Sequence, residues 1–508
     1  MIIIGWVVSR NMKSGEDLFL AGRSLGFATI GFSLFASNIS STTLIGVTGQ
    51  AYSSGISVAN YELMAGILLA IMAFTTIPVF LKIRITTVPE FFGQRFGPTA
   101  QKYISGLTLF LTVFVDMAAS IYAGVIVLQV FFPGASFIPL CLGLAVFAGI
   151  YTATGGLRAV VYTDVLQAII LLSGAAALSY LIYSEFGFDW ETAKAAVPQG
   201  HMSLVRPASD AALPWPGLII GVPVLGWFYW SANQYVIQRV LAAKNSDAAR
   251  QGASFAGLLK ILPLLLLAIP GALAVPLLEP LDNSDLVFPT LISEYLPAGL
   301  TGLVLAGLIA AIMSTIDSTL NSASTLVLYD FVNVKERGWS DKTILRIGRF
   351  TTCGLIVIAA FWPLVIREFP GVFNYIQQVF GYAVPPVVAV FLVALFWKGT
   401  TRSGVLITLL TGHIAGGGIF VWRAAHSTAD ASDGLPHFTI VAGLTMIASL
   451  FLCIAISALD KNKPVNADSV WHPTNMAPET KVTSIFADYR YQAVGVLILT
   501  LLVIWLFR

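Results

Sequence analysis

Long apolar runs, separated by short polar segments, make up most of the chain. An α-helix needs about 20 apolar residues to cross a bilayer. On that criterion the chain contains thirteen predicted spans, at residues 26–53, 56–81, 103–132, 137–154, 158–183, 213–241, 251–278, 286–329, 344–366, 371–397, 403–424, 437–459 and 489–507. The run at 286–329 is long enough to hold a short outer helix before its spanning helix. The opening MIIIGWVVSR is too short to span and is predicted to be the remnant of a truncated first helix.

The first span carries a polar stretch at its middle, ASNISSTTLIGVTGQAYSSG at 36–55. Non-helical backbone at membrane depth occurs where it is buried in protein or lines a cavity, and transporters bind ions at such broken helices. The alternative is that these small polar residues pack one helix closely against another. The sixth span is also interrupted, by Gly221, Pro223 and Gly226 in GVPVLGWFYW at 221–230. A matched pair of interrupted segments indicates the binding site of a transporter.

Spans one to five and six to ten predict two halves of equal helix number, at 26–183 and 213–398. An odd number of spans per half inverts the second half in the membrane relative to the first. Residues 1–25 are then a truncated helix with a cytoplasmic loop, and residues 399–508 form peripheral helices with a second loop. The orientation follows from lysine and arginine, which gather in cytoplasmic segments. Most of the 28 such residues fall on one side when the first loop is cytoplasmic, with Arg239 and Arg250 counted among them.

The composition supports this class of protein. Hydrophobic residues make up 57% of the 508 residues and charged residues 11%, with a mean hydropathy of +0.82. These values predict an all-α polytopic membrane protein, and the net charge of +2 gives no indication of nucleic-acid binding. The three cysteines lie in apolar runs without CxxC spacing, and the five histidines have no metal-site spacing. No base accompanies a nucleophile or metal, so the sequence predicts no enzyme.

Ionisable residues inside a bilayer are costly and indicate functional sites. Glu62 and Lys260 are opposite in sign and lie in the second and seventh spans. They predict either a buried ion pair that fixes packing or two polar ends that hold a hydroxylated solute. The second interpretation is favoured because Tyr61, Tyr229 and Trp230 lie in neighbouring spans, and aromatic faces beside a few polar groups suit sugars.

Four further acidic residues lie within predicted spans: Asp116, Asp164, Asp317 and Asp330. For Asp116, a structural hydrogen bond is as well supported as a role in transport. Asp330 falls at the cytoplasmic end of its span and is predicted to be interfacial.

The run AAIMSTIDSTLNSAST at 310–325 places several hydroxyls on one membrane helix. Ser314 and Ser318 share a face, since they are four residues apart. Hydroxyls in such a helix often bond back to its own carbonyls. The alternative is a hard-cation site, built from these hydroxyls and from carbonyls freed by the broken first span. Asp164 would add a negative charge to that site.

Several stretches resemble the sodium:solute symporter family, and within it the sodium/sugar cotransporter branch for glucose and galactose. They are FLAGRSLG (19–26), SLFASNIS (33–40), ANYELMAG (59–66), GGLRAVVYTDVLQ (155–167), LPWPG (213–217), FYWSANQYVIQRVLAAKN (228–245), STIDSTLNSAST (314–325) and YIQQVFGYAVPP (375–386). The similarity covers essentially the whole chain in order. It implies a LeuT-type five-plus-five inverted repeat with extra flanking helices, which thirteen spans and a truncated first helix fit.

The resemblance also implies roles for individual residues. The implied sodium ligands are the carbonyls of Ala36, Ile39 and Ala311 and the hydroxyls of Ser314 and Thr315. Asp164, with Ser318 nearby, resembles the acidic residue that some members use at or near a second sodium site, so one or two sodium ions are expected. The implied solute contacts are Asn38, Thr43, Glu62, Lys260 and Gln377. Tyr229 and Trp230 match the inner aromatic gate, and Tyr61 and Phe373 the outer gate.

The chain departs from the family pattern at four positions of the implied solute pocket. Thr43 replaces a glutamine or histidine, Val47 a methionine, Ala65 a serine and Gly226 an asparagine. These changes leave a sugar as the expected class of solute, but the particular sugar stays open.

The expected protein is therefore a multi-pass transporter of the bacterial inner membrane, in contact with lipid and without an obligate protein partner. Its expected function is sodium-driven uptake of a monosaccharide. Three alternatives stay open at this point. They are another solute such as an inositol or a sialic acid, proton coupling through Asp164, and a sensor that binds solute without moving it.

Overall fold

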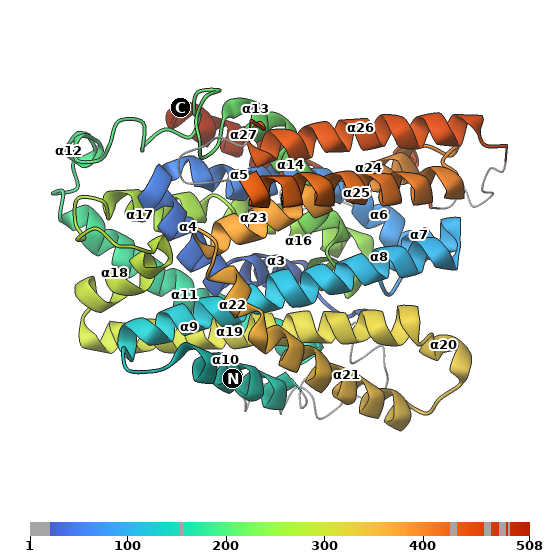
Figure 1. Ribbon diagram of the computed structural model, residues 1–508, viewed down its shortest axis with the longest axis horizontal. Helices are drawn as coiled ribbons and strands as arrows, with labels where there is room; N and C mark the ends of the chain where they lie inside the picture. The colour runs from blue at the N-terminus through green and yellow to red at the C-terminus, as the bar shows by residue number, and fades with distance from the viewer. Residues whose placement is uncertain (1–20, 153–156, 427–433, 462–468, 477–483, 486–487) are drawn as a thin grey trace.

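The computed structural model describes residues 21–152, 157–426, 434–461, 469–476, 484–485 and 488–508. All regular elements in these ranges are helical, apart from two isolated β-bridges. Most helices run side by side along the long axis of the molecule (Figure 1). Nine of the described helices are long and apolar enough to cross a membrane, or up to eleven if each of two bent pairs is one span. The chain is therefore a polytopic helical protein, as predicted.

The helices of the first half begin at the polar stretch. They are α3 (Phe27–Asn38), α4 (Ser41–Ser54), α5 (Asn60–Phe74), α6 (Thr76–Ile83), α7 (Val88–Phe96), α8 (Pro98–Phe110), the π-helical turn η3 (Leu111–Met117), α9 (Ala118–Phe131), α10 (Phe137–Thr152) and α11 (Leu157–Ser184). A short helix, α12 (Trp190–Ala195), lies in the connection to the second half.

The second half and the C-terminal helices follow. They are α13 (Trp215–Ile220), α14 (Val222–Trp227), the π-helical turn η4 (Phe228–Ala232), α15 (Gln234–Leu241), α16 (Ser246–Leu259), η5 (Leu264–Ala268), α17 (Ile269–Leu273), η6 (Ser284–Leu286), α18 (Val287–Tyr295), α19 (Ala298–Leu326), η7 (Val327–Phe331), α20 (Val334–Arg337), α21 (Asp341–Phe361), α22 (Pro363–Ile366), α23 (Val372–Ala383), α24 (Pro385–Phe396), α25 (Arg402–His426), α26 (Phe438–Leu459) and α27 (Tyr489–Leu506). The short outer helix predicted before the eighth span is α18.

The predicted count of thirteen spans stays a prediction. Two of the predicted spans do not qualify by length and composition: α10 is apolar but short, and the chain at 213–241 is divided into several short helices. The predicted truncated first helix, and its loop as far as residue 20, lie outside the described residues.

The first predicted break is present between α3 and α4, whose axes differ by 55°. The hydrogen bonds of α3 end with the Ile39 N–H on the Phe35 carbonyl (2.8 Å), and those of α4 begin with the Leu44 N–H on the Ser40 carbonyl (3.0 Å). The last four carbonyls of a helix have no partner within it. The break therefore leaves the carbonyls from Ala36 to Ile39 for other ligands.

The sixth span is interrupted at two places. The predicted interruption is present at Gly221, where α13 ends and α14 begins with Pro223 in its first turn. The other was not predicted and lies at Asn233, whose backbone is extended (φ −74°, ψ 121°) between η4 and α15. This second break thus falls at an asparagine, whose side chain can bond where its backbone does not.

A third bend, of 53° between α23 and α24, was not predicted. Pro385 and Pro386 begin α24, and because a proline has no N–H, neither can donate to a carbonyl of the preceding turn. The motif that contains this proline had been identified in the sequence, but the bend had not.

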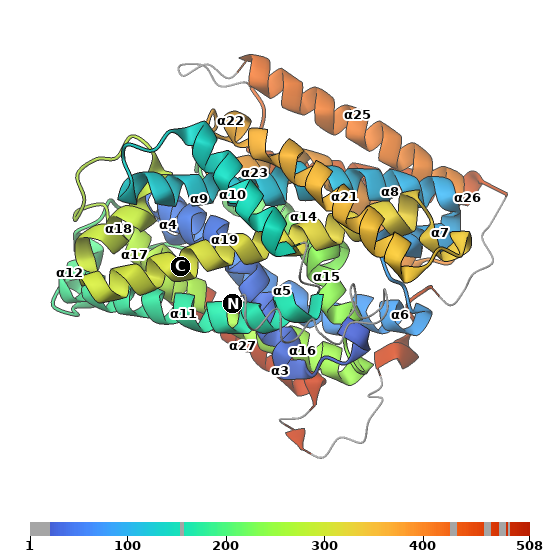
Figure 2. The same cartoon turned by 90° about the horizontal axis from the view of Figure 1, so that it is seen from below.

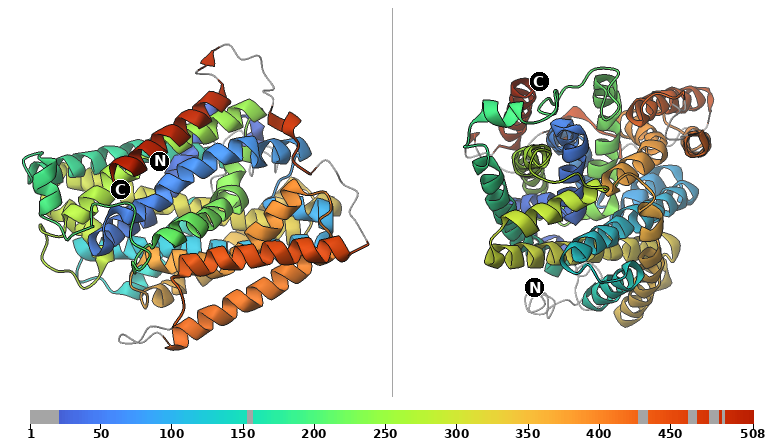
Figure 3. Two further views of the ribbon diagram at one scale, coloured as in Figure 1. Left: turned by 90° about the horizontal axis from the view of Figure 1, so that it is seen from above. Right: turned by 60° about the vertical axis from the view of Figure 1, so that its left-hand side comes forward.

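Backbone hydrogen bonds join the start of the first half to the second half. The N–H of Leu25, just before α3, donates to the Ala242 carbonyl (3.0 Å), and the N–H of Lys244 donates to the Leu25 carbonyl (3.0 Å). The beginning of the first broken span therefore lies beside the end of the second, as inversion requires. Seen nearly along the helices, α3 and α4 occupy the middle of the molecule (Figure 3, right).

Helix α16 packs against both α3 and α5. A Cβ added at Gly66 would lie 3.0 Å from the carbonyl oxygen of Gly257, so the two glycines allow α5 and α16 to cross closely. The C-terminal helices differ in position. Helix α25 lies along an outer edge (Figure 2), whereas α27 packs against α5 and α16. The division of the chain at residues 25 and 398 stays a prediction.

Candidate functional site

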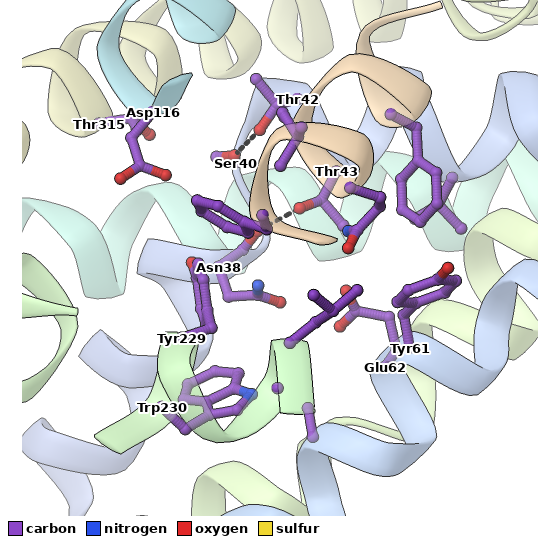
Figure 4. A pocket seen from close by; sticks show the side chains of 18 of the residues that line it. Asn38, Ser40, Thr42, Thr43, Tyr61, Glu62, Asp116, Tyr229, Trp230 and Thr315 are labelled. Carbon is purple, nitrogen blue, oxygen red and sulfur yellow. Dashed lines mark hydrogen bonds between the residues drawn. The ribbon is translucent and has the colours of Figure 1, made fainter. Parts of the chain in front are cut away.

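A cavity lies beside the break between α3 and α4 (Figure 4). It encloses about 820 Å³ of space free of atoms, counting the open space at its mouth. All but one of the predicted solute and gate residues line this cavity: Asn38, Thr43, Glu62, Gln377, Tyr61, Phe373, Tyr229 and Trp230. The structure thus brings together residues from α3, α4, α5, η4 and α23. Their roles in binding stay predictions.

Lys260 is the exception, because it lies behind the wall of this solute cavity. Its side chain is fully buried, and its Nζ donates to Glu62 Oε2 at 2.6 Å and to Asn38 Oδ1. The ammonium also lies 5.0 Å from the centre of the Trp230 ring. Lys260 therefore holds Glu62 and Asn38 in place. The sequence predicted either a buried ion pair or polar groups that face a solute. Glu62 fits both interpretations, because it forms a buried ion pair and also lines the cavity.

Two aromatic contacts mark the ends of the solute cavity. The rings of Tyr61 and Phe373 meet edge to face, with centres 5.1 Å apart. The same two residues line a smaller cavity beside Gln50 and Asn374, so this contact separates two spaces. Tyr229 packs against Trp230 at 5.0 Å. This geometry suits the predicted outer and inner gates.

A second cavity, of about 290 Å³, contains all the predicted sodium ligands. Its lining includes the five residues of the first predicted site, Ala36, Ile39, Ala311, Ser314 and Thr315, and both residues of the second, Asp164 and Ser318. Residues at the C-terminal end of α3 and hydroxyl residues of α19 thus line one small space. Oxygen ligands of this kind suit a hard cation such as sodium.

Asp164 does not lie in this ion cavity as an isolated charge. Arg239 Nη2 donates to Asp164 Oδ2 at 3.0 Å, and both side chains are almost completely buried. Ser33 donates to the same carboxylate oxygen at 2.9 Å, and Ser314 donates to the other. Arg239 also donates to Ser318 Oγ at 3.0 Å. The prediction of a free negative charge was incomplete, because it lacked this arginine.

Arg239 and Arg250, which the prediction counts among the cytoplasmic charges, are both buried in the protein. Arg239 lies within α15 and is 1% exposed, and Arg250 lies within α16 and is 2% exposed. Asp330, predicted to be interfacial, is buried as well, and its carboxylate accepts hydrogen bonds from Thr87, Gln101 and Ser105. The positions of these three residues relative to the membrane stay predictions.

The two cavities share a wall. Thr315 and Tyr235 line both of them, and the Tyr235 hydroxyl bonds to that of Tyr229 at 2.6 Å. Sequence reasoning missed Tyr235 and Arg239. Their spacing of four residues in QYVIQRVL, directly after the aromatic FYW, was the available signal.

Asp116 is a further missed residue of the solute cavity. It lies in η3, lines the cavity, and accepts a hydrogen bond from the Asn233 side chain at 3.3 Å. The hydrogen bond predicted for Asp116 is thus present, at the break of the sixth span.

Comparison with known proteins supplies the context for this site. Residues 18–412 match the family described as "SSF: Sodium:solute symporter family". The human sodium/myo-inositol cotransporter is 30% identical, over 97% of this chain and 76% of that protein. The rabbit (Oryctolagus cuniculus) sodium/glucose cotransporter 1 is 32% identical, over 89% of this chain and 74% of that protein.

Solved structures share the fold. A sodium-coupled sialic acid symporter in a substrate-bound outward-open state has a TM-score of 0.78 and 21% identity, and the alignment covers 91% of this chain and 96% of the symporter. A transporter of the nucleobase-cation-symport-1 family in a closed conformation has a TM-score of 0.58 and 16% identity, with 90% and 98% covered. Both are transporters, and the arrangement of helices in this chain is similar to theirs.

Proposed function

The chain belongs to the sodium:solute symporter family, and from that premise we propose that it couples inward sodium movement to uptake of a monosaccharide. The proposed solute is of the glucose or galactose type, and the proposed mechanism is alternating access. The family consists of sodium-coupled membrane transporters of small solutes. The proposal adds the solute, the direction and the residues that bind each ligand.

One observation carries the proposal. The cavity with the predicted sodium ligands touches the cavity with the predicted solute ligands, through Thr315 and Tyr235. A sodium ion between the α3 carbonyls and the α19 hydroxyls would fix the break in the position that shapes the solute cavity. By linkage, each ligand then raises the affinity of the other by the same factor. Each sodium ion gains about 2.3 kcal/mol per 100 mV of membrane potential, which supports a solute gradient of more than tenfold.

In this mechanism Glu62, Asn38, Thr43 and Gln377 bind the hydroxyls of the solute, and the aromatic rings cover its C–H faces. Lys260 acts from behind, by orienting Glu62 and Asn38. The contact between Tyr61 and Phe373 closes the outer side, and Tyr229 with Trp230 closes the inner side. We place the protein in a bacterial inner membrane, with thirteen spans and a truncated first helix.

Myo-inositol is the second candidate solute. A sodium/myo-inositol cotransporter is as similar to this chain as the sodium/glucose cotransporters are. An inositol and a hexose present similar rings of hydroxyls, so the same carboxylate and amide groups serve both.

Proton coupling through Asp164 is less well supported. Its carboxylate is bonded to Arg239, Ser33 and Ser314, so protonation would remove a buried ion pair.

The test is uptake of labelled glucose, galactose and myo-inositol into proteoliposomes, with an inward sodium gradient and then with potassium in its place. Sodium-dependent accumulation of one of them is expected, together with its loss in Gln377→Ala and in Ser314→Ala. Accumulation driven equally by potassium, or by a proton gradient alone, would contradict the proposal. If sodium stabilises the protein but none of the three solutes is taken up, the proposal of a sodium symporter stands and the proposed solute is wrong.

A further inference from the structure

The solute cavity has two carboxylates on its wall but no cationic side chain. Glu62 and Asp116 are the charged residues among those that line it. They lie at opposite sides of the cavity (Figure 4). The negative charge of Glu62 is balanced by Lys260 directly behind it, at 2.6 Å. Among the described residues, no lysine, arginine or histidine forms an ion pair with Asp116.

Asp116 is also short of hydrogen-bond donors. Its carboxylate accepts one bond, from the Asn233 amide at 3.3 Å, although a carboxylate can accept about four. The nearby hydroxyls are committed elsewhere: Thr315 donates to the Ala311 carbonyl at 3.0 Å, and Ser120 donates to the backbone carbonyl of Asp116 itself at 3.0 Å. A buried carboxylate is costly unless donors surround it. Because Asp116 lines the cavity, a ligand there can reach the remaining acceptor positions of its carboxylate.

The local backbone turns Asp116 toward this space. Residues Leu111–Met117 form a π-helical turn, a feature that is often found at functional sites because it shifts side chains around the helix. Asn233, its partner, is the extended residue at the second break. Asp116 lines the solute cavity and is not among the residues that line the ion cavity.

We propose that Asp116 binds the solute directly, accepting hydrogen bonds from two neighbouring hydroxyls, and that it excludes solutes that carry a carboxylate. This inference rests on the proposed function, and it names the class of solute: neutral and rich in hydroxyls at both ends. Glu62 binds one end of such a molecule and Asp116 the other. An anionic solute, such as a uronic acid or a sialic acid, would bring a third negative charge into a cavity with one balancing cation.

The experiment uses the purified full-length chain in sodium, with solute affinity measured by the shift in melting temperature and by competition with labelled solute. Glucose and glucuronate form a matched pair, since they differ by one carboxylate, and myo-inositol is a second neutral probe. The variant is Asp116→Asn. Its control is Asp330→Asn, because Asp330 is a buried carboxylate in another π-helical turn but does not line the solute cavity.

The native protein is expected to bind a neutral probe at least about 100-fold more tightly than glucuronate, because like charges inside a binding site are strongly unfavourable. In Asp116→Asn the affinity for the neutral probe is expected to fall about tenfold, and the preference over glucuronate to shrink by at least tenfold. Sodium alone should still stabilise the variant. Asp330→Asn should leave both the affinity and the preference unchanged.

Unchanged affinity and preference in Asp116→Asn would overturn the inference, as would native binding of glucuronate as tightly as glucose. If no neutral probe binds while sodium still stabilises the protein, the proposed solute is wrong, but the role of Asp116 has not yet been contradicted. The same variants are then measured with the solute that does bind. An anionic solute overturns the role of Asp116, and a neutral one whose affinity falls in Asp116→Asn supports it.

Discussion

Two buried ion pairs lie on either side of the broken span, and they use their carboxylates differently. Glu62 pairs with Lys260 at 2.6 Å, and its carboxylate remains on the wall of the solute cavity. Asp164 pairs with Arg239 at 3.0 Å, and hydroxyls of Ser33 and Ser314 occupy its carboxylate as well.

Both pairs join the two halves: the first links α5 to the C-terminal end of α16, and the second links α11 to α15, with hydroxyls from α3 and α19 around it. A carboxylate that is enclosed by donors holds helices together, and one that keeps a face toward a cavity remains available to a ligand. In the proposed mechanism, a buried ion pair therefore serves packing at Asp164 and solute recognition at Glu62.

The largest expected effect comes from Asp164→Ala. It leaves Arg239 buried without its counter-charge, which typically costs about 3–5 kcal/mol of the free energy of unfolding. Thermal unfolding in detergent should show this loss, and sodium should no longer stabilise the variant. The double variant Asp164→Leu/Arg239→Met is expected to regain most of the stability but not the response to sodium. A stable single variant that still responds to sodium would refute a central role for this pair.

Glu62→Gln should show the opposite pattern, with a smaller loss of stability and a larger loss of solute affinity than Asp164→Ala. Lys260 keeps its contacts with Asn38 and Trp230, and the glutamine oxygen can still accept its hydrogen bond, so the expected cost in stability is about 2 kcal/mol. Solute affinity should fall about 10- to 100-fold, because a charged acceptor is lost at the cavity wall. Melting temperature and solute affinity are measured in parallel on this variant and on Asp164→Asn. If the two variants change both quantities equally, the two ion pairs do not differ in role.

Asp285 offers a third arrangement, outside the candidate membrane-spanning helices. Its carboxylate caps α23 by accepting the Val372 N–H at 2.9 Å, and burial raises its pKa to about 6. A carboxyl group whose pKa is higher in the folded than in the unfolded protein binds its proton first in the fold. Stability therefore rises as the pH falls through 6. Between pH 8 and pH 5 the expected gain is about 1.4 kcal/mol relative to Asp285→Asn.

The check is the difference in melting temperature between the native protein and Asp285→Asn at several pH values. The asparagine keeps an acceptor for the Val372 N–H, so the comparison isolates the charge. A difference that does not change with pH would contradict the raised pKa.

The smallest expected effect is that of Tyr235→Phe, which lies between the two ion pairs. It removes the hydroxyl contact with Tyr229, worth about 1 kcal/mol, and leaves both ion pairs intact. The dependence of solute affinity on sodium should weaken severalfold, since Tyr235 lines both cavities. Tyr375→Phe is the matched control, because that hydroxyl bonds to Phe114 and Trp362 and lines neither cavity. Equal effects of the two variants would show that the tyrosine acts through packing.

The sequence was sufficient to predict the elements with strong local signals. The polar residues at 36–55 predicted the first break because hydroxyls at membrane depth need partners. The hydroxyls of 310–325 predicted one wall of the ion cavity, since their spacing places Ser314 and Ser318 on one helix face. The resemblance to the family supplied what no local pattern contains, namely the carbonyl positions in α3 and the contact of Tyr61 with Phe373.

The features that the sequence did not predict depend mostly on contacts between residues far apart in the chain. Arg239 resembled a loop charge because its counter-charge, Asp164, lies 75 residues earlier. Asp116 resembled an isolated charge until the second break brought Asn233 to it, 117 residues later. The third bend was missed because Pro385 lies in a continuous apolar run, where length alone predicts one straight helix.

The contact of Leu25 with Ala242 also sets the order of events during synthesis. The Arg23 guanidinium donates to the Leu241 carbonyl, 218 residues later in the chain. At about 5–20 residues per second, the ribosome needs roughly 10–45 seconds to produce that partner. During this interval the backbone groups of Leu25 have no partner from the second half. The segment before α3 is then in contact with the insertion machinery or with lipid. The contact between the two halves can thus form only after the first broken span of the second half has been made.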